Sequence, residues 1–285
     1  TINANISASY RLNEQLSLGL GLNLVYGEAE LIRHAGSVLE NGVSIPGVGL
    51  VVAPVQASTE VVNMAGDDFG YGWNIGAVYE LNENHRFAVT YRSKVALAFE
   101  GEFSGLGTPE TAASLTVDMP AFAEFSGFHQ FTRQWAAHYS VMYTQWSSFE
   151  KLEAYTGDEL AFEKQENFED SYRFALGATY NATQALTLRA GIAFDQSAAE
   201  SYRSISIPDS DRLWYSAGAT YTLNSNDSID FAISYINGDS VVVTEEDALL
   251  EELPDTLSGV VGNKDWSFSS EGNALLVGLQ YNKRF

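Results

Sequence analysis

Strict alternation of apolar and polar residues along the whole chain is the feature that most limits what this sequence can fold into. In the first twelve residues the even positions are apolar: Ile2, Ala4, Ile6, Ala8, Tyr10 and Leu12. The odd positions there are Thr, Asn, Ser or Arg. Because successive side chains of a β-strand point to opposite faces, this pattern predicts a strand with one apolar face.

The same period recurs often enough to predict eleven strands and no helix. The predicted strands are residues 1–12, 16–26, 69–81, 86–99, 114–125, 134–149, 171–180, 185–195, 212–223, 228–236 and 273–285. No linker or shift in composition separates them, so we expect a single domain over residues 1–285.

The apolar residues are plentiful but never continuous. The chain is 45% hydrophobic, yet it holds no unbroken apolar run of the roughly 18 residues that a membrane-spanning helix needs. Its aromatic content of 13% is typical of the aromatic girdles of outer-membrane barrels. The predicted fold class is therefore all-β, a transmembrane antiparallel β-barrel.

The connections between predicted strands alternate in length. Short polar turns include Leu12–Gln15, Asn82–His85, Asn181–Gln184 and Asn224–Asp227. Long loops are predicted at His34–Asp68, Phe103–Ala113, Glu153–Glu169, Ser197–Asp211 and Val242–Ser270. Bacterial barrels have short periplasmic turns and long extracellular loops, so this sorting indicates a barrel in the outer membrane of a Gram-negative cell.

Charged residues within the strands supply an independent test of which face meets lipid. In residues 86–99 the phase of Phe87, Val89, Tyr91, Val95 and Leu97 is predicted to face lipid, and that of Arg86, Arg92 and Lys94 the lumen. Seven further charges fall opposite the apolar phase of their strands: Arg173, Arg189, Arg212, Asp118, Glu124, Asp195 and Asp230. We expect them to form a lumenal lattice of salt bridges, which can also act as a charged barrier.

The net charge of −22 excludes nucleic acid as a partner, because polyanions repel each other. Cysteine is absent, which suits passage through an oxidising periplasm. Phe285, in the outward phase of the last strand, is typical of the C-terminal signal read by the barrel-assembly machinery. Since single-chain barrels have an even number of strands, we expect further strands before Thr1.

Four segments are specific enough to resemble a known family. FGYGWNIGAVYELNENHRFAVTYRSKV, RQWAAHYSVMYTQWSSFEKL, YRFALGATY and YRSISIPDSDRLWYSAGATY are similar to successive strands and turns of the FadL family of long-chain fatty acid transporters. The resemblance covers nearly the whole chain and is strongest at Ser204–Arg212. It implies a barrel of about fourteen strands, of which about eleven are present, lacking its first strands and an N-terminal plug.

The resemblance also implies a function and a binding site. It implies passive uptake of long-chain fatty acids, captured in an apolar groove between the loops His34–Asp68 and Phe103–Ala113. The first loop contains VSIPGVGLVVAPV, an apolar stretch that suits lipid capture and could equally cover the barrel mouth. Arg33 in ELIRHAG and Lys164 in AFEKQENF match the pair that holds the carboxylate.

Other functions have less support in the residues. An enzyme is not expected, because the four histidines accompany no GxSxG motif and only His34 reaches the outer loops. A general porin and a carrier of aromatic hydrocarbons remain alternatives. The acidic stretch Thr244–Asp255 could bind cations that bridge lipopolysaccharide, although it lacks the spacing of a calcium loop. No cofactor is expected, and the expected partners are fatty acids or similar molecules, outer-membrane lipid and lipopolysaccharide, and the assembly machinery.

Overall fold

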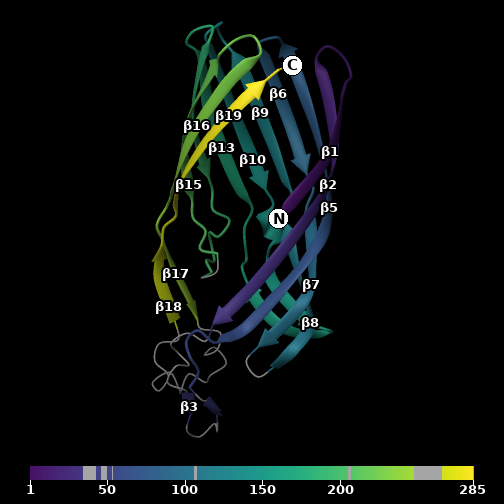
Figure 1. Ribbon diagram of the computed structural model, residues 1–285, viewed down its shortest axis with the longest axis vertical. Coiled ribbons are helices and arrows are strands. Elements are labelled where there is room, and N and C mark those ends of the chain that lie inside the picture. Colours follow the sequence, from purple (N-terminus) through teal and green to yellow (C-terminus); the bar gives the residue numbers. More distant parts are fainter. Residues whose placement is uncertain are drawn as a thin grey trace.

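The computed structural model describes residues 1–34, 43–45, 50–52, 54–105, 108–204, 207–246 and 265–284. Their strands form one large antiparallel sheet that curls into an incomplete cylinder (Figure 1). Two small hairpins lie apart from this sheet. Among the described residues no helix is both long and apolar enough to cross a membrane.

The wall of the cylinder is an antiparallel meander in which each wall strand is hydrogen-bonded to the next wall strand along the chain, although other strands are inserted between some of them. Its strands, in order, are β1 (Ile2–Arg11), β2 (Leu16–His34), β5 (Glu60–Asn82), β6 (His85–Arg92), β9 (Phe122–Gln130), β10 (Trp135–Thr144), β13 (Ser171–Asn181), β14 (Leu186–Asp195), β15 (Arg212–Thr222), β16 (Asp227–Gly238) and β19 (Asn273–Lys283). Within the described residues the all-β prediction is thus confirmed, and these eleven strands belong to a sheet of 15.

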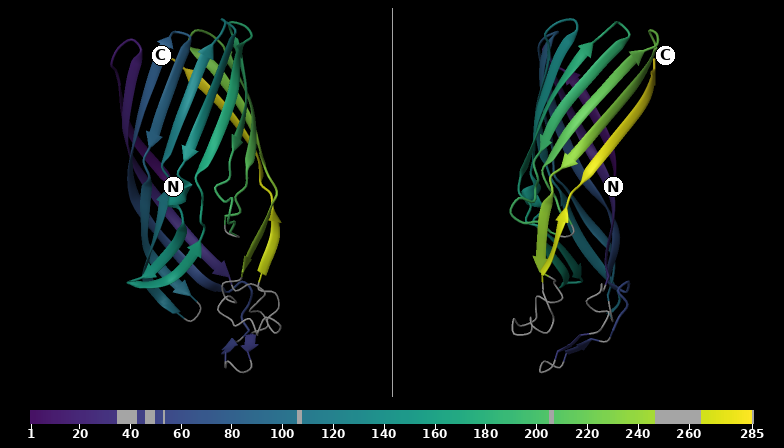
Figure 2. Two further views of the ribbon diagram at one scale, coloured as in Figure 1. Left: turned by 180° about the vertical axis from the view of Figure 1, so that it is seen from behind. Right: turned by 90° about the vertical axis from the view of Figure 1, so that its left-hand side faces the viewer.

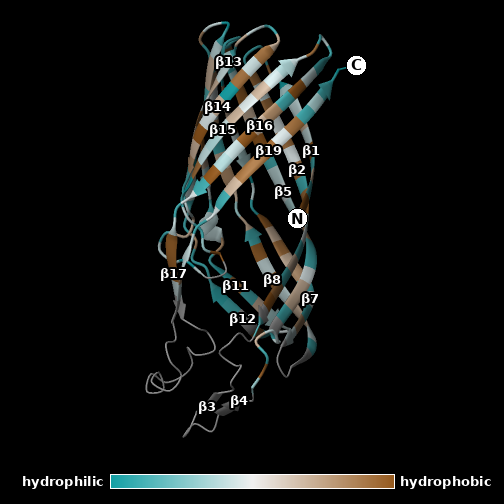
Figure 3. Cartoon of the chain, turned by 60° about the vertical axis from the view of Figure 1, so that its left-hand side comes forward, coloured by the Kyte–Doolittle hydropathy of each residue, from teal (hydrophilic) through white to brown (hydrophobic). Residues whose placement is uncertain are grey.

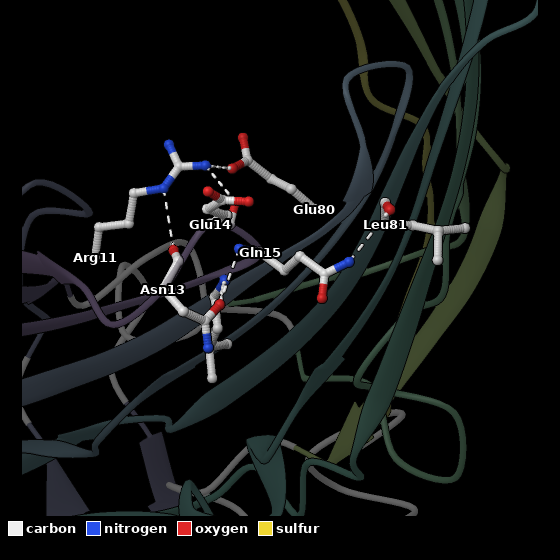
Figure 4. Close-up of polar contacts among 7 residues, drawn as sticks. Arg11, Asn13, Glu14, Gln15, Glu80 and Leu81 are labelled. Carbon is white, nitrogen blue, oxygen red and sulfur yellow. Dashed lines mark hydrogen bonds and ion pairs between the residues drawn. The ribbon is translucent and has the colours of Figure 1, made fainter.

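The short turns gather at one end of the cylinder, together with the C-terminal strand end, and the long connections gather at the other (Figure 2). In each short turn the oxygen of a polar side chain accepts hydrogen bonds from backbone amides of the same turn. In the first turn Asn13 Oδ1 accepts from the amides of Gln15 and Leu16, both at 2.9 Å. Arg11 of β1 reaches across β2 to β5 there, with its Nη2 2.5 Å from Glu80 Oε2 (Figure 4).

Apolar side chains cover the outside of the wall, as the alternation predicts. Leu22, Tyr71, Leu176 and Leu279 are 66%, 76%, 56% and 78% exposed, values that are high for residues of this kind. Bands of hydrophobic colour alternate with polar ones along the strands (Figure 3). Such a surface is stable only against hydrocarbon, because so large an apolar area in water would aggregate.

The apolar belt has a sharp boundary on the long-loop side. On β2 the outward residues are apolar from Leu16 to Tyr26 and then change to Glu28 and Glu30. Tyr26 packs on Phe69 of β5 with ring centroids 4.9 Å apart. A belt of about ten residues ending in aromatics matches a strand that crosses a bilayer.

Two of the predicted strands are broken at this boundary. The segment 86–99 divides at Ser93 and Lys94 into β6 and β7 (Val95–Gly105), and the segment 114–125 divides at Pro120 and Ala121 into β8 (Thr108–Met119) and β9. β5 pairs with β6 near the short turns and with β7 near the long loops. Proline cannot donate to a β ladder, which explains the break between β8 and β9.

Beyond the break the face assignment of the sequence is wrong. Val95, Leu97 and Phe99 face the interior, where they form a buried cluster with Val25. Glycines of β5 allow this close approach, since a Cβ at Gly70 would lie 2.5 Å from Val95 Cγ1. Asp118 lies on the opposite, outer face of the hairpin, where its Oδ2 is 2.7 Å from Lys94 Nζ.

The long-loop end carries more regular structure than predicted. The expected loop Phe103–Ala113 is the tip of the β7–β8 hairpin, and β5 already begins at Glu60 inside the expected loop His34–Asp68. The expected loop Glu153–Glu169 contains most of β11 (Lys151–Thr156) and all of β12 (Glu159–Gln165), which extend the sheet from β8. The turn Trp146–Ser148 follows β10.

Short hairpins occupy parts of two other connections. β3 (Val43–Ile45) pairs with β4 (Leu50–Val52), and β17 (Val241–Glu246) pairs with β18 (Asp265–Ser270). The predicted signal residue Phe285 lies outside the described residues, as do most of the acidic stretch Thr244–Asp255 and parts of the apolar stretch Val43–Val55.

Adjacent positions on β13 test which face meets lipid. Leu176 points outward and Ala175 inward at nearly the same depth in the belt. Because a lipid-facing arginine near the bilayer midplane costs about 2–4 kcal/mol, Leu176→Arg should lower the free energy of unfolding by that amount. Ala175→Arg should lower it by less than about 1 kcal/mol. Urea unfolding in lipid vesicles measures both, and equal losses would contradict the face assignment.

The packing of β7 against β5 is tested at Gly101. A Cβ there would lie 1.8 Å from the backbone oxygen of Ala65, so Gly101→Ala must push the strands apart. We expect a loss of about 1–3 kcal/mol in the free energy of unfolding, typical of overpacking. Gly278→Ala is the matched control, because a Cβ at Gly278 meets no atom within 4 Å. Equal unfolding curves for the two variants in detergent micelles would refute the close contact.

Candidate functional site

An apolar cavity opens on the inner face of the sheet at the long-loop end. It has a volume of about 190 Å³ and lies between β2, β5, the β7–β8 hairpin and β11. Its wall includes Ala29, Leu31, Met64, Phe99, Leu115 and Leu152. The alternation predicts polar residues on the inner face, so an apolar inner wall is unexpected. It arises because the apolar side chains of β7 and β8 point inward and not toward lipid.

The strand register explains how these side chains meet. Leu31 lies directly opposite Met64 in the β2–β5 ladder, and Phe99 lies opposite Leu115 in the β7–β8 ladder. Directly opposed residues share a face of the sheet. Leu152 is added by β11, which pairs with β8 through Ala154 and Tyr155.

Arg33 lies on β2, which lines this cavity, and Lys164 lies on β12, which pairs with the lining strand β11. Arg33 follows Leu31 by two residues on β2, so its backbone position shares the phase of Leu31, and it pairs with Val62 of β5. Lys164 of β12 lies opposite Leu152 of β11 in the ladder. The register therefore relates these two positions, 131 residues apart in the numbering, to strands that line the cavity, Arg33 directly and Lys164 through β11.

A compact loop supports the cavity from the side of β11. Residues 197–204 and 207–211, the described part of the expected loop Ser197–Asp211, fold around Asp209, whose Oδ2 accepts from Ser197 Oγ and from the amide of Ala198. Arg212 Nη2 lies 3.2 Å from Asp209 Oδ1. Ala198 joins an apolar cluster with Phe149, against which Leu152 packs.

The sequence contains a signal for the compact loop around Asp209, but it does not show that this loop packs beside the cavity. The motif PDSDR, Pro208–Arg212, contains the carboxylate that closes the loop, and it lies in the stretch with the strongest family resemblance. The contribution of Leu152 had no signal in the alternation, because β11 was predicted as part of a loop. Only the pairing of β11 with β8 brings Leu152 to the cavity.

The predicted lumenal charges divide into two groups. Arg212 forms ion pairs with Asp195 and Asp209, at 3.7 Å and 3.2 Å, as a salt-bridge lattice requires. Three arginines instead lie over aromatic rings. Arg86 Cζ is 4.5 Å from the centroid of Phe128, Arg92 Cζ is 5.6 Å from Phe122, and Arg173 Cζ is 4.4 Å from the ring of Trp214.

The remaining predicted charges lie inside by register. Glu124 lies opposite Thr90 and Met142, in the same row as Arg173. Asp230 lies opposite Thr220, whose hydroxyl donates to Asp230 Oδ1 and accepts from Arg189 Nη1 at 2.7 Å. Of the charges predicted to face the lumen, Lys94 and Asp118 depart from the expectation as already described.

The outer rim of the cylinder is strongly acidic. Glu28, Asp67 and Glu100 lie side by side in the register of β2, β5 and β7, just beyond the aromatic pair that ends the belt. Like charges opposite each other are destabilising. A hydrogen bond to Glu110, together with repulsion between the two carboxyl groups, raises the pKa of Glu102 above its usual range.

In the described part of the chain no group of three or more His, Asp or Glu side chains is arranged to hold a metal ion. Apolar side chains form most of the wall of the cavity at the long-loop end, and Glu30 and Glu102 also line it. Such a wall suits an apolar molecule.

Comparison with known proteins agrees with this architecture. The family model described as outer membrane protein transport protein (OMPP1/FadL/TodX) matches residues 1–285. The long-chain fatty acid transport protein of Escherichia coli K12 is 38% identical over 315 residues, covering 100% of this chain and 67% of that protein. Outer membrane protein P1 of Haemophilus influenzae is 39% identical over 311 residues, covering 100% of this chain and 65% of that protein.

Solved structures show the same fold. A Pseudomonas aeruginosa FadL homologue superimposes with a TM-score of 0.78 at 22% identity, covering 99% of this chain and 67% of that one. The toluene transporter TbuX of Ralstonia pickettii gives a TM-score of 0.60 at 20% identity, covering 98% and 66%.

This chain spans about two thirds of the length of the relatives, with 66% of the Salmonella typhi long-chain fatty acid transport protein covered. The family match, the identity to its members and the curled antiparallel sheet agree with one another. The chain therefore belongs to the outer-membrane transport protein family that includes FadL and TodX.

Proposed function

We propose that the protein is an outer-membrane channel for passive uptake of long-chain fatty acids. The proposal is supported by the apolar cavity on the inner face, with Arg33 on the lining strand β2 and Lys164 on β12, next to the lining strand β11. The name of the Escherichia coli relative, a long-chain fatty acid transport protein, supports the same cargo.

The acyl chain is the part of the cargo that the cavity binds. Each buried methylene contributes about 0.8 kcal/mol, so even part of a long acyl chain binds strongly to an apolar wall. The β7–β8 hairpin supplies that wall through Phe99 and Leu115. We assign the first capture of the chain to the loops His34–Asp68 and Phe103–Ala113, which leave the wall beside this cavity.

The carboxylate is held by Arg33 and Lys164. A guanidinium can bind a carboxylate with two parallel hydrogen bonds, and an ammonium adds a point charge. Arg33 on β2 and Lys164 on β12 flank β5, β7, β8 and β11 in the order of the sheet, and we propose that an acid with its tail in the cavity places its head between them. This assignment explains why basic residues occur there in a chain with 37 acidic and 15 basic residues.

Aromatic hydrocarbons are the competing cargo, since the toluene transporters share the fold. Two cations favour an acid, because a neutral hydrocarbon gains nothing from them and pays their desolvation. A general porin is distinguished by its ion conductance in planar bilayers, which an apolar, partly filled lumen would keep low. In either case the exterior belt meets lipid, and the acidic rim lies at the level of lipopolysaccharide.

Replacing both basic residues tests the carboxylate site. Arg33→Ala with Lys164→Ala should weaken oleate binding about ten- to a hundredfold, since a hydrogen bond to a charged group contributes about 1.5–3 kcal/mol. Binding of oleyl alcohol, which has the same chain and no charge, should change less than threefold. Isothermal titration of the detergent-purified protein measures both ligands.

Lys151→Ala is the matched control for that experiment, because Lys151 Nζ lies 2.6 Å from Glu153 Oε1 and away from the cavity wall. It removes one positive charge at the same end of the molecule. Oleate affinity that is unchanged in the double variant, or lowered equally by Lys151→Ala, would contradict the carboxylate role.

Filling the cavity tests the acyl site separately. Ala113 lines the cavity, whereas Ala112 is exposed on the other face of β8. Ala113→Leu should weaken oleate and oleyl alcohol alike, because it removes volume from a cavity of only 190 Å³. Ala112→Leu should leave both affinities unchanged, and equal effects of the two variants would show that the cavity is not the acyl site.

A further inference from the structure

Two histidines face each other on the outer face of the wall, at its short-turn end. His85 is the first residue of β6, and His129 is the last but one of β9. The register of these antiparallel strands places them directly opposite each other. They share the outward phase of Val89 and Phe125, so the pair lies outside the lumen. Both strands are hydrogen-bonded to neighbours on their two sides, so this part of the wall is complete in the described chain.

The facing nitrogen atoms of the two rings are close together. Nδ1 of His85 lies 3.0 Å from Nδ1 of His129, so one of them carries the proton of a hydrogen bond and the other accepts it. A bond from Zn²⁺ to an imidazole nitrogen is about 2.0–2.1 Å long, so two such bonds meeting at about 90–110° place their nitrogens about 2.9–3.4 Å apart. The observed distance already lies in that range.

Aromatic rings fix the two imidazoles in this arrangement. Tyr139 stacks on His129, with ring centroids 5.7 Å apart and an interplanar angle of 27°. Phe87 meets the same imidazole edge to face at 5.2 Å, and Phe131 lies 6.5 Å from the ring of His85. Ligands that are held in place before binding lose less conformational freedom when they bind. A small rotation of each ring directs both Nδ1 lone pairs to one ion.

The position in the wall does not by itself call for histidine. At the same end of the apolar belt the exposed side chains include Phe131, Trp135 and Tyr221, which are 67%, 50% and 53% exposed. Aromatic residues of this kind are typical of the interface between lipid and water. An imidazole offers less apolar surface than these rings and adds two polar nitrogens. Two imidazoles with converging nitrogens have the chemistry of a metal chelate.

We propose that His85 and His129 together bind a divalent transition metal ion at the short-turn margin of the apolar belt. Imidazole suits Cu²⁺, Ni²⁺ and Zn²⁺, and among these Cu²⁺ binds most strongly. Each histidine binds through Nδ1, and the proton that one ring holds there moves to Nε2 of the same ring. Water supplies the remaining ligands, in agreement with the finding that the described residues contain no group of three or more protein ligands. The site is independent of the proposed cargo.

Copper provides a direct test on the full-length protein, purified in detergent without a polyhistidine tag. One equivalent of Cu²⁺ should give an electron paramagnetic resonance spectrum with two imidazole nitrogens on the metal. His85→Phe and His129→Phe keep an aromatic ring at each position and leave a single imidazole. Each should lower the affinity for Cu²⁺, measured by competition with a chelator, at least about tenfold, because the two linked ligands become one.

His138→Phe is the matched control, because His138 lies on the inner face with its Nε2 2.9 Å from Thr179 Oγ1. It should leave the spectrum and the affinity unchanged. A spectrum of the parent protein with one imidazole nitrogen or none would overturn the site, whether or not the variants fold. Equal affinities in the parent protein, His85→Phe and His129→Phe would overturn it as well.

Discussion

The demand for backbone hydrogen bonds in hydrocarbon determines the rest of this structure. Lipid offers no partner to an amide or a carbonyl, so each wall strand must pair along its length with its neighbours. The ladders from β1 to β19 meet this demand with few irregularities. Once the strands are paired, alternation places every second side chain outward, and polar residues are tolerated only inside.

That constraint ends where Tyr26 packs on Phe69, and the cavity that we assign to the acyl chain lies beyond this level. Beyond this level the outside meets water, so Glu28 and Glu100 can occupy outward positions. The apolar residues of β7 and β8 are then free to turn inward and bury one another. The apolar cavity formed by β7 and β8 thus lies in the part of the sheet that the bilayer does not contact.

The sequence predicted the strands and turns well because alternation and turn residues are local properties. It could not predict that the face of β7 is reversed. Phe87, Val89, Tyr91, Val95 and Leu97 are all odd-numbered, so their phase is continuous through the break at Ser93 and Lys94. Alternation shows that one face is apolar but not whether lipid or another strand covers it. The positions of Arg33 and Lys164 came from family resemblance, and only the pairing of β11 with β8 relates them to one cavity.

The energetic terms explain how an acidic protein can take up an anion. Two exposed charges about 8 Å apart in water repel by only about 0.5 kcal/mol, and salt screens them further. Burial of ten methylenes contributes about 8 kcal/mol, which outweighs repulsion from several rim carboxylates. The acidic rim therefore does not exclude the proposed cargo. Under this proposal the apolar walls supply affinity, and the basic side chains supply orientation and preference for an acid.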